Sequence, residues 1–402
     1  MYHLYKAFCR TFQAVFNIGA RLLPWRKARI VQGAGAIGEI PSLLNNLGAK
    51  KPIVVTDPGL MAAGVSPMIL KILDEQAIPY VLFAKVEPNP SVNTVNEINA
   101  LYLENKCDGV IAIGGGSAMD AAKAAAARVV RPRKSVQKLG GLLRVLKKLP
   151  PFIAVPTTAG TGSETTIAAL ITDTETHHKY AIMDLSLIPR YAVLDPELTL
   201  GLPPHITAAT GMDALTHAVE AYLCWTYNTK ESLRFAEEAV GMIFQNLPKV
   251  YENGNDIEAR ANMLLASYKA GFAFTRAGVG NVHAIAHTLG GLYNTPHGLA
   301  NAVILPIVLE DYGKKVYKKL AKLAKFAGIA AGECEEADAK AFIAAVKQFN
   351  EDMNIPTGFD FIKDEDIPQM VKWAAKEANP IYPVPVLYDG KRFTEVIEKV
   401  RT

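Results

Sequence analysis

The residues best suited to chemistry in this 402-residue chain are four histidines and an aspartate with helical spacing. Asp213 and His217 lie four positions apart, so both occupy one face of a helix. His283 and His287 repeat that spacing, and His297 follows them. One carboxylate with three imidazoles suits a borderline divalent metal, Fe(II) or Zn(II), and leaves a coordination position open for a substrate oxygen. We therefore predict a metal site, and the spacing leaves open which three of the four histidines bind.

A glycine turn after an apolar run predicts where the phosphates of a dinucleotide would bind. Residues 109–113 have the composition of a buried strand, and Gly114, Gly115, Gly116 and Ser117 follow at the start of an alanine-rich helical stretch. The backbone N–H groups of such a turn, together with a helix N-terminus, favour a pyrophosphate.

A second glycine pattern competes with this turn. Gly33, Gly35 and Gly38 form a literal GxGxxG, but the apolar segment before them is very short. Asp57 follows another predicted strand, 19 residues beyond Gly38. A carboxylate there accepts hydrogen bonds from the ribose hydroxyls and repels a 2′-phosphate, which favours NAD over NADP. We therefore place the pyrophosphate at residues 114–117 and the ribose at Asp57.

A third loop supplies hydroxyl groups after a further apolar run. Residues 156–164 read PTTAGTGSE, and their small side chains suit close approach to a phosphate or to nicotinamide. The same composition is also typical of an ordinary polar turn. The loop is therefore either a contact for the cofactor or a purely structural turn.

Two kinds of element must position these residues. From about residue 30 to 200, short apolar runs alternate with helical stretches, which predicts a doubly wound parallel sheet of Rossmann-like α/β type. After Pro204 the pattern is helical throughout, which predicts an all-α half. The expected strands are 30–31, 52–55, 80–83, 109–113, 152–155 and 191–194. The expected later helices are 208–223, 230–251, 257–274, 313–327, 336–350 and 366–377.

We divide the chain into a leader helix (1–28), a dinucleotide-binding α/β domain (29–202) and a helical metal-binding domain (203–402). Ligand sites in such proteins usually lie where the two halves meet, outside the carboxyl ends of the strands.

The leader has the pattern of a basic amphipathic helix that Pro24 ends. Its polar side chains recur at steps of three and four residues, at Lys6, Arg10, Gln13, Asn17 and Arg21. We interpret it as a helix packed on its own protein or on a sister subunit. The alternatives are docking on a shell or a membrane surface, and a transit peptide.

The formal net charge of +4 conceals two basic segments. Residues 1–38 and 128–148 carry basic but no acidic side chains, so the remainder is net acidic. Neither segment has the interleaved aromatic residues of a nucleic-acid platform, so we expect no nucleic acid partner, and we interpret 128–148 as a solvated loop and helix. The four cysteines are widely spaced, and no apolar run approaches the ~20 residues of a membrane span. Together these observations favour a cytoplasmic location.

Four motifs together resemble the iron-dependent (group III) alcohol dehydrogenase family. They are GGGSAMDAAK, PTTAGTGSE, ATGMDALTHAVEAY and VHAIAHTLGGLYNTPHGLANA, and the match runs from about residue 30 to near the C-terminus. The resemblance implies a dehydroquinate-synthase-like architecture with an α/β half and a helical half. It implies the metal ligands Asp213, His217, His283 and His297. His287 is not a ligand in the family and becomes a candidate catalytic proton relay near the nicotinamide.

The resemblance also implies contacts with cofactor and substrate. The cofactor contacts are Gly114, Gly115, Gly116, Ser117, Asp120, Thr157, Thr158, Thr161 and Lys179, with Asp57 at the NAD-selecting position. Phe274 matches a family position that lines the substrate pocket. The family usually carries a cysteine near an Asn-Pro-Arg triplet in its C-terminal segment, whereas here Asn379 begins the sequence NPIYPVP. We place Asn379 in the substrate pocket.

The implied function is an NAD(H)-linked alcohol dehydrogenase or aldehyde reductase acting on small primary alcohols or diols. Hydride transfer would proceed with Fe(II) or Zn(II) as the Lewis acid. Family members commonly form homodimers or larger homo-oligomers. Alternatives with the same fold are a polyol or glycerol dehydrogenase, a hydroxyacid–oxoacid transhydrogenase and a dehydroquinate-synthase-like lyase. An alternative of a different class is an assembly or membrane-surface component that acts through the leader.

Overall fold

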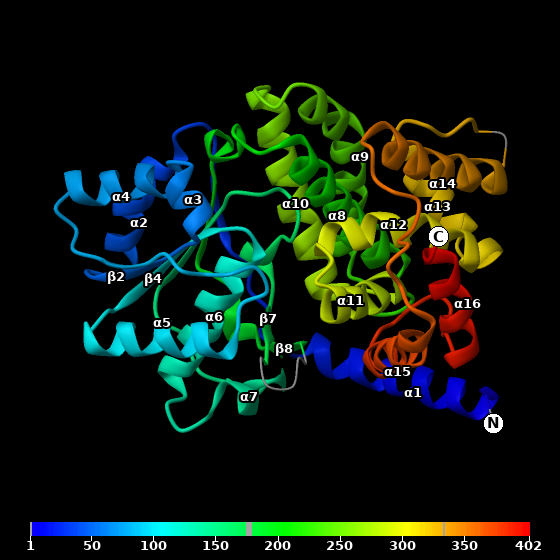
Figure 1. Ribbon diagram of the computed structural model, residues 1–402, viewed down its shortest axis with the longest axis horizontal. Coiled ribbons are helices and arrows are strands. Elements are labelled where there is room, and N and C mark those ends of the chain that lie inside the picture. Colours follow the sequence, from blue (N-terminus) through cyan, green and yellow to red (C-terminus); the bar gives the residue numbers. More distant parts are fainter. Residues whose placement is uncertain (1, 174–178, 333) are drawn as a thin grey trace. The chain divides into compact units, whose positions relative to one another are not determined.

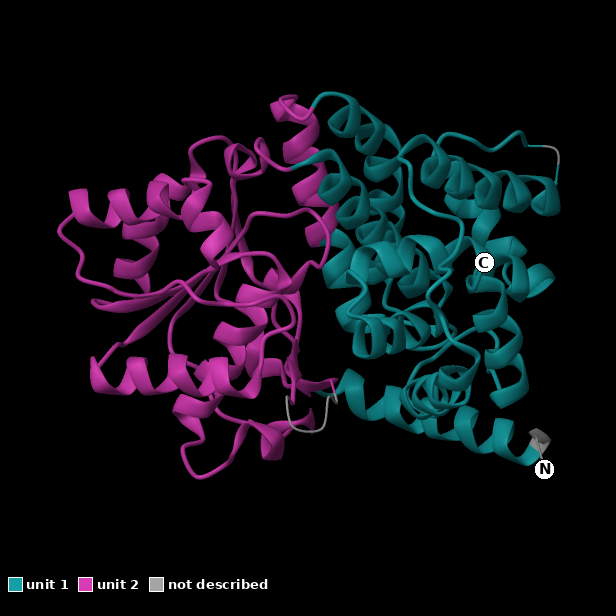
Figure 2. Cartoon of the chain, viewed as in Figure 1, with its two compact units in different colours: residues 1–23, 203–253, 269–402 teal, residues 24–202, 254–268 magenta. Residues whose placement is uncertain are grey.

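The computed structural model describes residues 2–173, 179–332 and 334–402. The chain separates into two compact units, which Figure 2 shows in different colours. Residues 24–202 and 254–268 form an α/β unit, and residues 1–23, 203–253 and 269–402 form a helical unit. The first helix of the chain therefore belongs to the same unit as the metal-ligand candidates.

The α/β unit is built on a parallel sheet of six strands, which confirms the predicted fold class. The strands are β1 (Arg29–Gln32), β2 (Pro52–Val55), β3 (Val81–Phe83), β4 (Gly109–Gly114), β6 (Phe152–Pro156) and β9 (Tyr191–Leu194). Their order in the sheet is β1-β9-β6-β4-β2-β3, with every neighbouring pair parallel. The six predicted apolar runs overlap these strands. Strands β2, β4 and β6 are buried along their whole length, and strands covered on both faces are apolar throughout.

Alternate side chains of each strand pack on opposite faces of this sheet. Ile53 and Val55 of β2 pack with α5 and α6, whereas Val54 packs with α2 and α4. Figure 1 shows these two pairs of helices on opposite sides of the sheet. The helices are α2 (Ile40–Leu47), α4 (Val65–Glu75), α5 (Val92–Glu104) and α6 (Gly116–Val130). The period of two residues along each strand produces this double packing.

The direction of winding reverses between β2 and β4. From β2 the chain continues outward to β3 and then returns to the other side of β2 as β4. Ligands of doubly wound folds bind at such a switch point, outside the carboxyl ends of the strands. Asp57 follows β2 and Gly115 follows β4, so the topology brings both predicted cofactor elements to this point.

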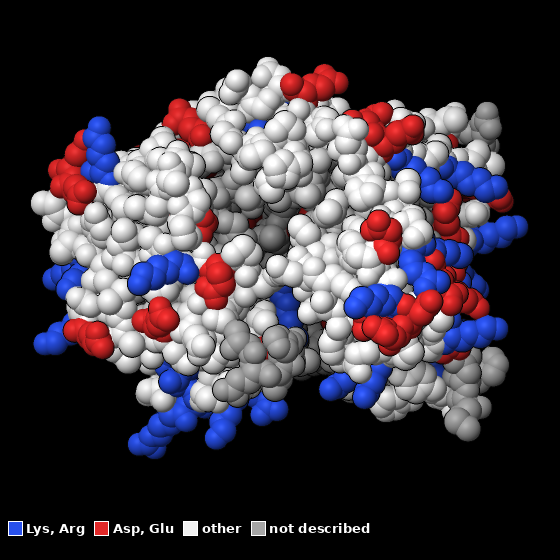
Figure 3. All heavy atoms as spheres, in the orientation of Figure 1, with Lys and Arg blue, Asp and Glu red and all other residues white. Residues whose placement is uncertain are grey.

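A small sheet of order β5-β8-β7 accompanies the main sheet. It contains β5 (Gly141–Leu142), β7 (Ala168–Thr172) and β8 (Lys179–Met183), and the short helix α7 (Val136–Leu139) precedes β5. The carboxylate of Asp184 accepts hydrogen bonds from the backbone N–H groups of Val145 and Leu146, which holds the end of the basic segment 128–148. Figure 3 shows Lys and Arg side chains gathered at the lower left, around the place of α7.

The helical unit brings three helices together around the metal-ligand candidates. Its elements are α1 (Tyr2–Arg21), α8 (Pro204–Leu223), α9 (Lys230–Glu252), α11 (Asn281–Tyr293), α12 (His297–Tyr312), α13 (Tyr317–Phe326), α14 (Glu335–Asp352), α15 (Ile367–Ala378) and α16 (Gly390–Val400), together with the later residues of α10 (Ile257–Ala277). Helix α12 packs against α8 and α11. A Cβ atom on Gly298 would lie 2.4 Å from the carbonyl oxygen of Ala209, so glycine lets α12 begin directly against α8.

Helix α1 confirms the helix predicted for the leader, but its orientation is unusual. Gln13 on the polar stripe is fully buried against its own unit, whereas Leu4 and Ile18 on the apolar side are exposed. Along the part of the chain that the structure describes, no helix combines the length and the apolar character that crossing a bilayer requires.

Candidate active site

Asp213, His217, His283 and His297 come together in the helical unit. One donor atom from each residue lies within 4.8 Å of the donor atoms of the other three. Asp213 and His217 lie one turn apart on α8, His283 lies in the first turn of α11, and His297 begins α12. The side chain of His297 is 29% exposed, whereas those of Asp213, His217 and His283 are almost fully buried. The cluster is therefore accessible from the side of His297.

The donor set fits a divalent transition metal. The amide nitrogen Nδ2 of Asn301 lies 2.7 Å from Oδ1 of Asp213 and 3.2 Å from the Nε2 atoms of both His283 and His297. Three lone-pair donors thus point to one small region. Burial, and secondarily the neighbouring imidazoles, hold the pKa of His283 well below its ordinary value. A neutral imidazole keeps the lone pair that metal binding requires.

Glu220 orients His283 from behind. The Nδ1 atom of His283 lies 2.6 Å from the Glu220 carboxylate, which also accepts hydrogen bonds of 2.8 Å from the backbone N–H groups of Gly280 and Val282. Because Nδ1 faces the carboxylate, Nε2 faces the ligand cluster, as for histidines that bind metals. A Cβ atom on Gly280 would lie 2.6 Å from Oε1 of Glu220, so this close approach requires glycine.

Asp57 and Gly114 meet at the switch point of the sheet. The Oδ1 atom of Asp57 accepts a 2.9 Å hydrogen bond from the backbone N–H of Leu60 and caps α3 (Pro58–Ala62). Gly114 has a φ of +147°, and a Cβ atom there would lie 2.8 Å from Cβ of Ala118 and 3.6 Å from Oδ2 of Asp57. The carboxylate is therefore fixed beside the glycine turn.

The next two glycines face the threonines of the 156–164 loop. A Cβ atom on Gly115 would lie 3.2 Å from Oγ1 of Thr158, and one on Gly116 would lie 2.9 Å from Cγ2 of Thr161. The start of α6, where Ser117 lies, has no side-chain cap. The structure thus brings the aspartate, the glycine turn and the threonine loop to the carboxyl ends of β2, β4 and β6. This is the surface that a pyrophosphate needs.

Two buried charged residues of α6 hold the threonine loop in place. The carboxylate of Asp120 accepts hydrogen bonds from Oγ of Ser163 (2.8 Å) and from the backbone N–H of Leu170 (2.9 Å). The Nζ atom of Lys123 donates to Oγ of Ser163 (3.0 Å) and Oγ1 of Thr166 (2.9 Å), and burial lowers the pKa of Lys123 to about 8. Asp120 therefore has a clear structural task, and its role as a cofactor contact stays a prediction.

Thr157 and Lys179 also make contacts within the α/β unit. The backbone N–H of Thr157 donates to the carbonyl oxygen of Gly114 (3.2 Å), which joins the two cofactor loops. The Nζ atom of Lys179, at the start of β8, donates to Oδ1 of Asn89 (2.9 Å). Their contacts with a cofactor stay predictions.

The competing glycine pattern has surroundings that oppose a phosphate. Its turn follows β1 at the edge of the sheet, away from the switch point. The backbone N–H of Ile37 donates to the carboxylate of Asp195 (3.1 Å), so a negative charge already lies at this turn. The geometry therefore supports the choice of residues 114–117 for the pyrophosphate.

Two sequence models of one family cover most of the chain. The model for the iron-containing alcohol dehydrogenase matches residues 27–196, and the model for the C-terminal part of the Fe-containing alcohol dehydrogenase family matches residues 207–399. The chain belongs to the iron-containing alcohol dehydrogenase family. It is therefore an oxidoreductase, and the resemblance seen in its motifs is confirmed. Helix α1 lies outside both matched ranges.

Relatives of this family extend the match over both units. NAD-dependent methanol dehydrogenase from Bacillus methanolicus is 38% identical over 356 residues, which cover 86% of this chain and 91% of the relative. The crystal structure of a 1,3-propanediol oxidoreductase has a TM-score of 0.90 and 34% identity, and the match covers 94% of this chain and 100% of that chain. Sulfoacetaldehyde reductase from Bifidobacterium kashiwanohense in complex with NAD+ has a TM-score of 0.83 and 29% identity, with 95% and 99% covered.

His287 lies beside the ligand cluster and makes a polar pair of its own. Its Nδ1 atom lies 2.6 Å from Oε1 of Glu377, and the same oxygen accepts a 2.7 Å hydrogen bond from the hydroxyl of Tyr382. The His287 ring stacks on that of His297, with 5.2 Å between centroids. Glu377 lies in the last turn of α15, and Tyr382 lies in the segment where this chain departs from the family pattern.

The two expected pocket residues have different surroundings. The Phe274 ring stacks on the imidazole of His217, with 4.2 Å between centroids, so Phe274 borders the ligand cluster. Asn379 is buried, and its Nδ2 donates to the carbonyl oxygen of Tyr388 (3.0 Å). Asn379 thus holds the C-terminal segment, and its place in the substrate pocket stays a prediction.

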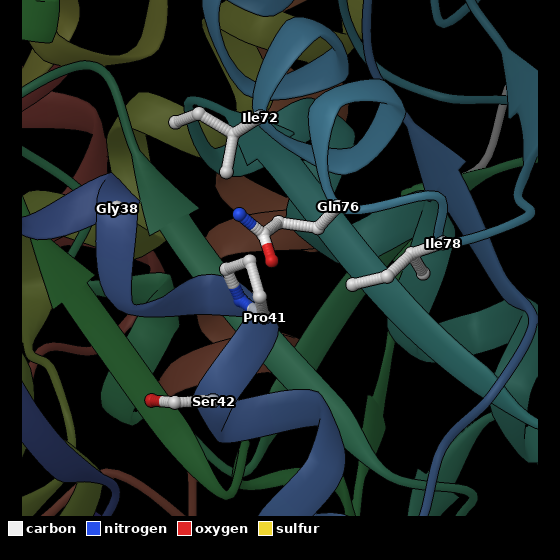
Figure 4. Close-up of a pocket in the computed structure, with 6 residues that line it drawn as sticks. All are labelled: Gly38, Pro41, Ser42, Ile72, Gln76 and Ile78. Carbon is white, nitrogen blue, oxygen red and sulfur yellow. The ribbon is translucent and has the colours of Figure 1, made fainter.

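A separate hollow lies on the α/β unit near α2 and α4. It has a volume of about 480 Å³ and is shown in Figure 4 with its lining residues Gly38, Pro41, Ser42, Ile72, Gln76 and Ile78. None of these side chains is charged. The hollow therefore lacks the groups that hydride or proton transfer requires.

Glu220, Asn301 and Glu377 are functional residues that the sequence motifs do not indicate. Glu220 lies two turns after Asp213 on α8, and Asn301 lies one turn after His297 on α12. Helical spacing from these two ligands could therefore have placed both residues near the metal site. Glu377 contacts a histidine 90 residues earlier, and no local pattern announces that contact.

Proposed function

We propose that this protein interconverts small primary alcohols or diols and their aldehydes, with NAD(H) and a divalent metal held by Asp213, His217, His283 and His297. The observation that carries the proposal is the convergence of these four donors in a chain of the iron-containing alcohol dehydrogenase family. When bound, iron or zinc supplies Lewis acidity toward the substrate oxygen, and the nicotinamide supplies or accepts the hydride.

The cofactor assignment rests on the loops of the α/β unit. Asp57 would accept hydrogen bonds from the ribose hydroxyls, and the backbone N–H groups of Gly115 to Ser117 would bind the pyrophosphate. Thr158 and Thr161 flank this turn. The NAD dependence in the name of one relative and the NAD+ bound to another support NAD(H) as the cofactor.

His287 is the residue that we assign to proton transfer. An imidazole exchanges protons readily near neutral pH, and the His287 side chain is 18% exposed, which gives it a route to solvent. With Nδ1 directed at Glu377, the Nε2 atom is left to face the substrate hydroxyl. Glu377 would fix this tautomer and the ring orientation, and Tyr382 would hold Glu377.

The Glu377→Gln variant is expected to turn over about tenfold more slowly, because an amide retains the shape but not the charge that fixes the imidazole. Metal content and KM for NADH should stay unchanged, since Glu377 contacts neither the ligand cluster nor the cofactor loops. Glu365→Gln, which changes an exposed carboxylate, is the matched control. Steady-state kinetics with metal analysis measures both quantities, and an unaltered kcat in Glu377→Gln would contradict the positioning role.

The Asp57→Asn variant is expected to raise the ratio of kcat/KM for NADPH to that for NADH by about tenfold or more, because the charge that repels a 2′-phosphate is lost. Asparagine still caps α3, so the helix stays formed. Asp57→Gly, without the side chain, should shift the ratio in the same direction. Kinetics with both cofactors measures the ratio, and equal ratios in wild type and variants would remove Asp57 from cofactor selection.

We further propose that the protein is a cytoplasmic homodimer or larger homo-oligomer. Cys9, Cys107, Cys224 and Cys334 are all free thiols, which supports a reducing compartment. Sedimentation analysis of the purified protein gives the oligomeric state.

The decisive test is oxidation of NADH by anaerobically purified protein reconstituted with Fe(II), across a series of short aldehydes. We expect metal-dependent oxidation of NADH at a rate that NADPH does not reach. A protein that binds metal and NADH but turns over no aldehyde would contradict the proposed reaction. Zinc-reconstituted protein, measured in parallel, separates a requirement for iron from a requirement for any divalent ion.

A further inference from the structure

The segment between α15 and α16 carries Tyr382 to the proton-transfer pair without regular structure of its own. Residues 379–389, all of which the structure describes, contain no helix or strand. The Tyr382 hydroxyl donates a 2.7 Å hydrogen bond to Oε1 of Glu377, the oxygen that lies 2.6 Å from Nδ1 of His287. The position of the tyrosine therefore depends on the hydrogen bonds that the backbone of this segment makes with neighbouring elements.

Helix α1 supplies the donors for two of these hydrogen bonds. The Nε2 atom of Gln13 donates to the carbonyl oxygens of Pro380 (2.8 Å) and Tyr382 (2.7 Å). Its Oε1 atom accepts from Nε1 of Trp225 (2.5 Å) and from Arg10 (2.9 Å), which fixes the orientation of the amide. Gln13 is fully buried, so an apolar side chain in its place would leave both carbonyl groups without this donor.

Further contacts bind α1 to the same segment. The guanidinium of Arg10 donates to the carbonyl oxygen of Pro385 (3.2 Å). Cys9 is fully buried in an apolar cluster with Val384 and Leu387. The buried face of α1 therefore follows the segment over most of its length.

The backbone of Tyr382 is held from two sides. Its N–H donates to the carbonyl oxygen of Ala378 at the end of α15 (2.7 Å), and its carbonyl oxygen accepts from Gln13 on α1. A residue held by one hydrogen bond can still rotate about it, whereas the second bond fixes the direction in which the side chain leaves the backbone. The bond to Gln13 therefore aims the Tyr382 hydroxyl at Glu377.

We propose that Gln13 is a positioning residue of the active site and that α1, which lies outside both family ranges, contributes to turnover. Gln13 fixes the backbone of Tyr382, the Tyr382 hydroxyl holds Glu377, and Glu377 orients the imidazole of His287. The inference rests on the proposed role of His287 in proton transfer. It adds to that role a helix from the other end of the chain.

Steady-state kinetics of the Fe(II)-reconstituted protein with NADH and a short aldehyde tests the proposal. Gln13→Met keeps the length of the side chain and removes both donors, so kcat should fall about threefold or more, because a misplaced catalytic group slows the reaction steeply. KM for NADH and metal content should stay unchanged. The matched control is Asn17→Leu, one turn later on the same face of α1. Asn17 donates to the carbonyl oxygen of Thr226 (3.0 Å), outside the segment, so this variant should keep the wild-type kcat.

A double-mutant cycle with Tyr382→Phe separates positioning from a general loss of stability. Tyr382→Phe alone should turn over more slowly than wild type. Adding Gln13→Met to it should cost less than about twofold more, because the hydroxyl that Gln13 aims is already absent. Gln13→Glu, which keeps an acceptor for the Trp225 indole, replaces Gln13→Met in the cycle if the methionine variant does not fold.

The Nδ1 proton of His287 gives a readout that does not depend on turnover. A short hydrogen bond to a carboxylate moves such a proton far downfield in the NMR spectrum. In the zinc-reconstituted protein, where His287→Ala identifies the resonance by its loss, Gln13→Met should shift it and Asn17→Leu should not.

Three results would overturn the proposal. One is a wild-type kcat in Gln13→Met when Glu377→Gln is slow. Another is an unmoved His287 resonance in Gln13→Met. The third is a Gln13→Met effect of the same size in the Tyr382→Phe background as in wild type. Normal turnover in Glu377→Gln itself would instead contradict the proposed proton-transfer pair, and the assignment of Gln13 would then fail as well.

Discussion

Replacing Asp213 with alanine is expected to strip the metal from the protein and to abolish alcohol dehydrogenation. Asp213 is the only carboxylate in the four-residue ligand cluster, so the variant loses both a ligand and the negative charge that offsets the cation. Removing a partner of a metal ligand already lowers affinity by about 10–100-fold. Loss of the ligand itself should exceed the upper end of that range.

Metal analysis after gel filtration, followed by zinc titration calorimetry, measures this effect without relying on turnover. Asp360→Ala, at an exposed aspartate outside the cluster, should retain the metal. Near-stoichiometric metal in Asp213→Ala would show that the remaining histidines suffice and would contradict the assignment. Circular dichroism should show an intact helical content, because α8 also packs against α9 and α12.

The second large effect is expected for His287→Ala, which should keep its metal and lose about 10²–10⁴-fold in kcat, the usual contribution of a general acid or base. The imidazole of His287 contacts Glu377 and stacks on His297, but it does not belong to the ligand cluster. The expected combination of full metal content and slow turnover differs from the result expected for Asp213→Ala, which loses both the metal and the turnover.

Metal content and single-turnover kinetics on the same preparation separate the two roles of a histidine at this position. If the His287→Ala protein contained no metal, His287 would be a metal ligand, and one of the other three histidines would not be. Full turnover in that variant would show that another group transfers the proton. His205→Ala, at an exposed histidine in the first turn of α8, is the matched control and should be neutral.

The centre of the main sheet was predictable because β2, β4 and β6 are buried on both faces. Ile53, Val54 and Val55 are all fully buried, so the strand has a continuous apolar run that stands out from the surrounding helices. The pair Asp213 and His217 was predictable for a similar reason, since a regular helix converts a spacing of four into a shared face. In both cases one regular element carries the whole signal.

Contacts between distant segments were not predictable in the same way. Glu377 meets His287 because α15 packs against α11, and no spacing within either segment encodes that packing. Asp120 illustrates the opposite difficulty. The sequence places it beside the glycine turn, but only the structure shows that Ser163 and Leu170 occupy both of its carboxylate oxygens.

Helix α1 shows a further limit of periodicity. The pattern of polar and apolar residues predicts two faces, and the usual rule is that the apolar face is buried. Here three hydrogen bonds to Gln13, from its amide to two backbone carbonyls and from an indole to its oxygen, hold the polar face inward. The sequence can reveal that a helix has two faces, and the partner decides which one is covered.

The position of Gln13 also has a consequence for how the protein is made. Two of its partners, Pro380 and Tyr382, are synthesised more than 360 residues later, so the polar face of α1 lacks part of its hydrogen bonds until most of the chain has been made. The same late segment delivers Tyr382 to Glu377, beside His287. The full attachment of an early helix and the positioning of the proton-transfer pair thus depend on the same late segment, and a chain without that segment carries an incompletely anchored α1 and an unfinished active site.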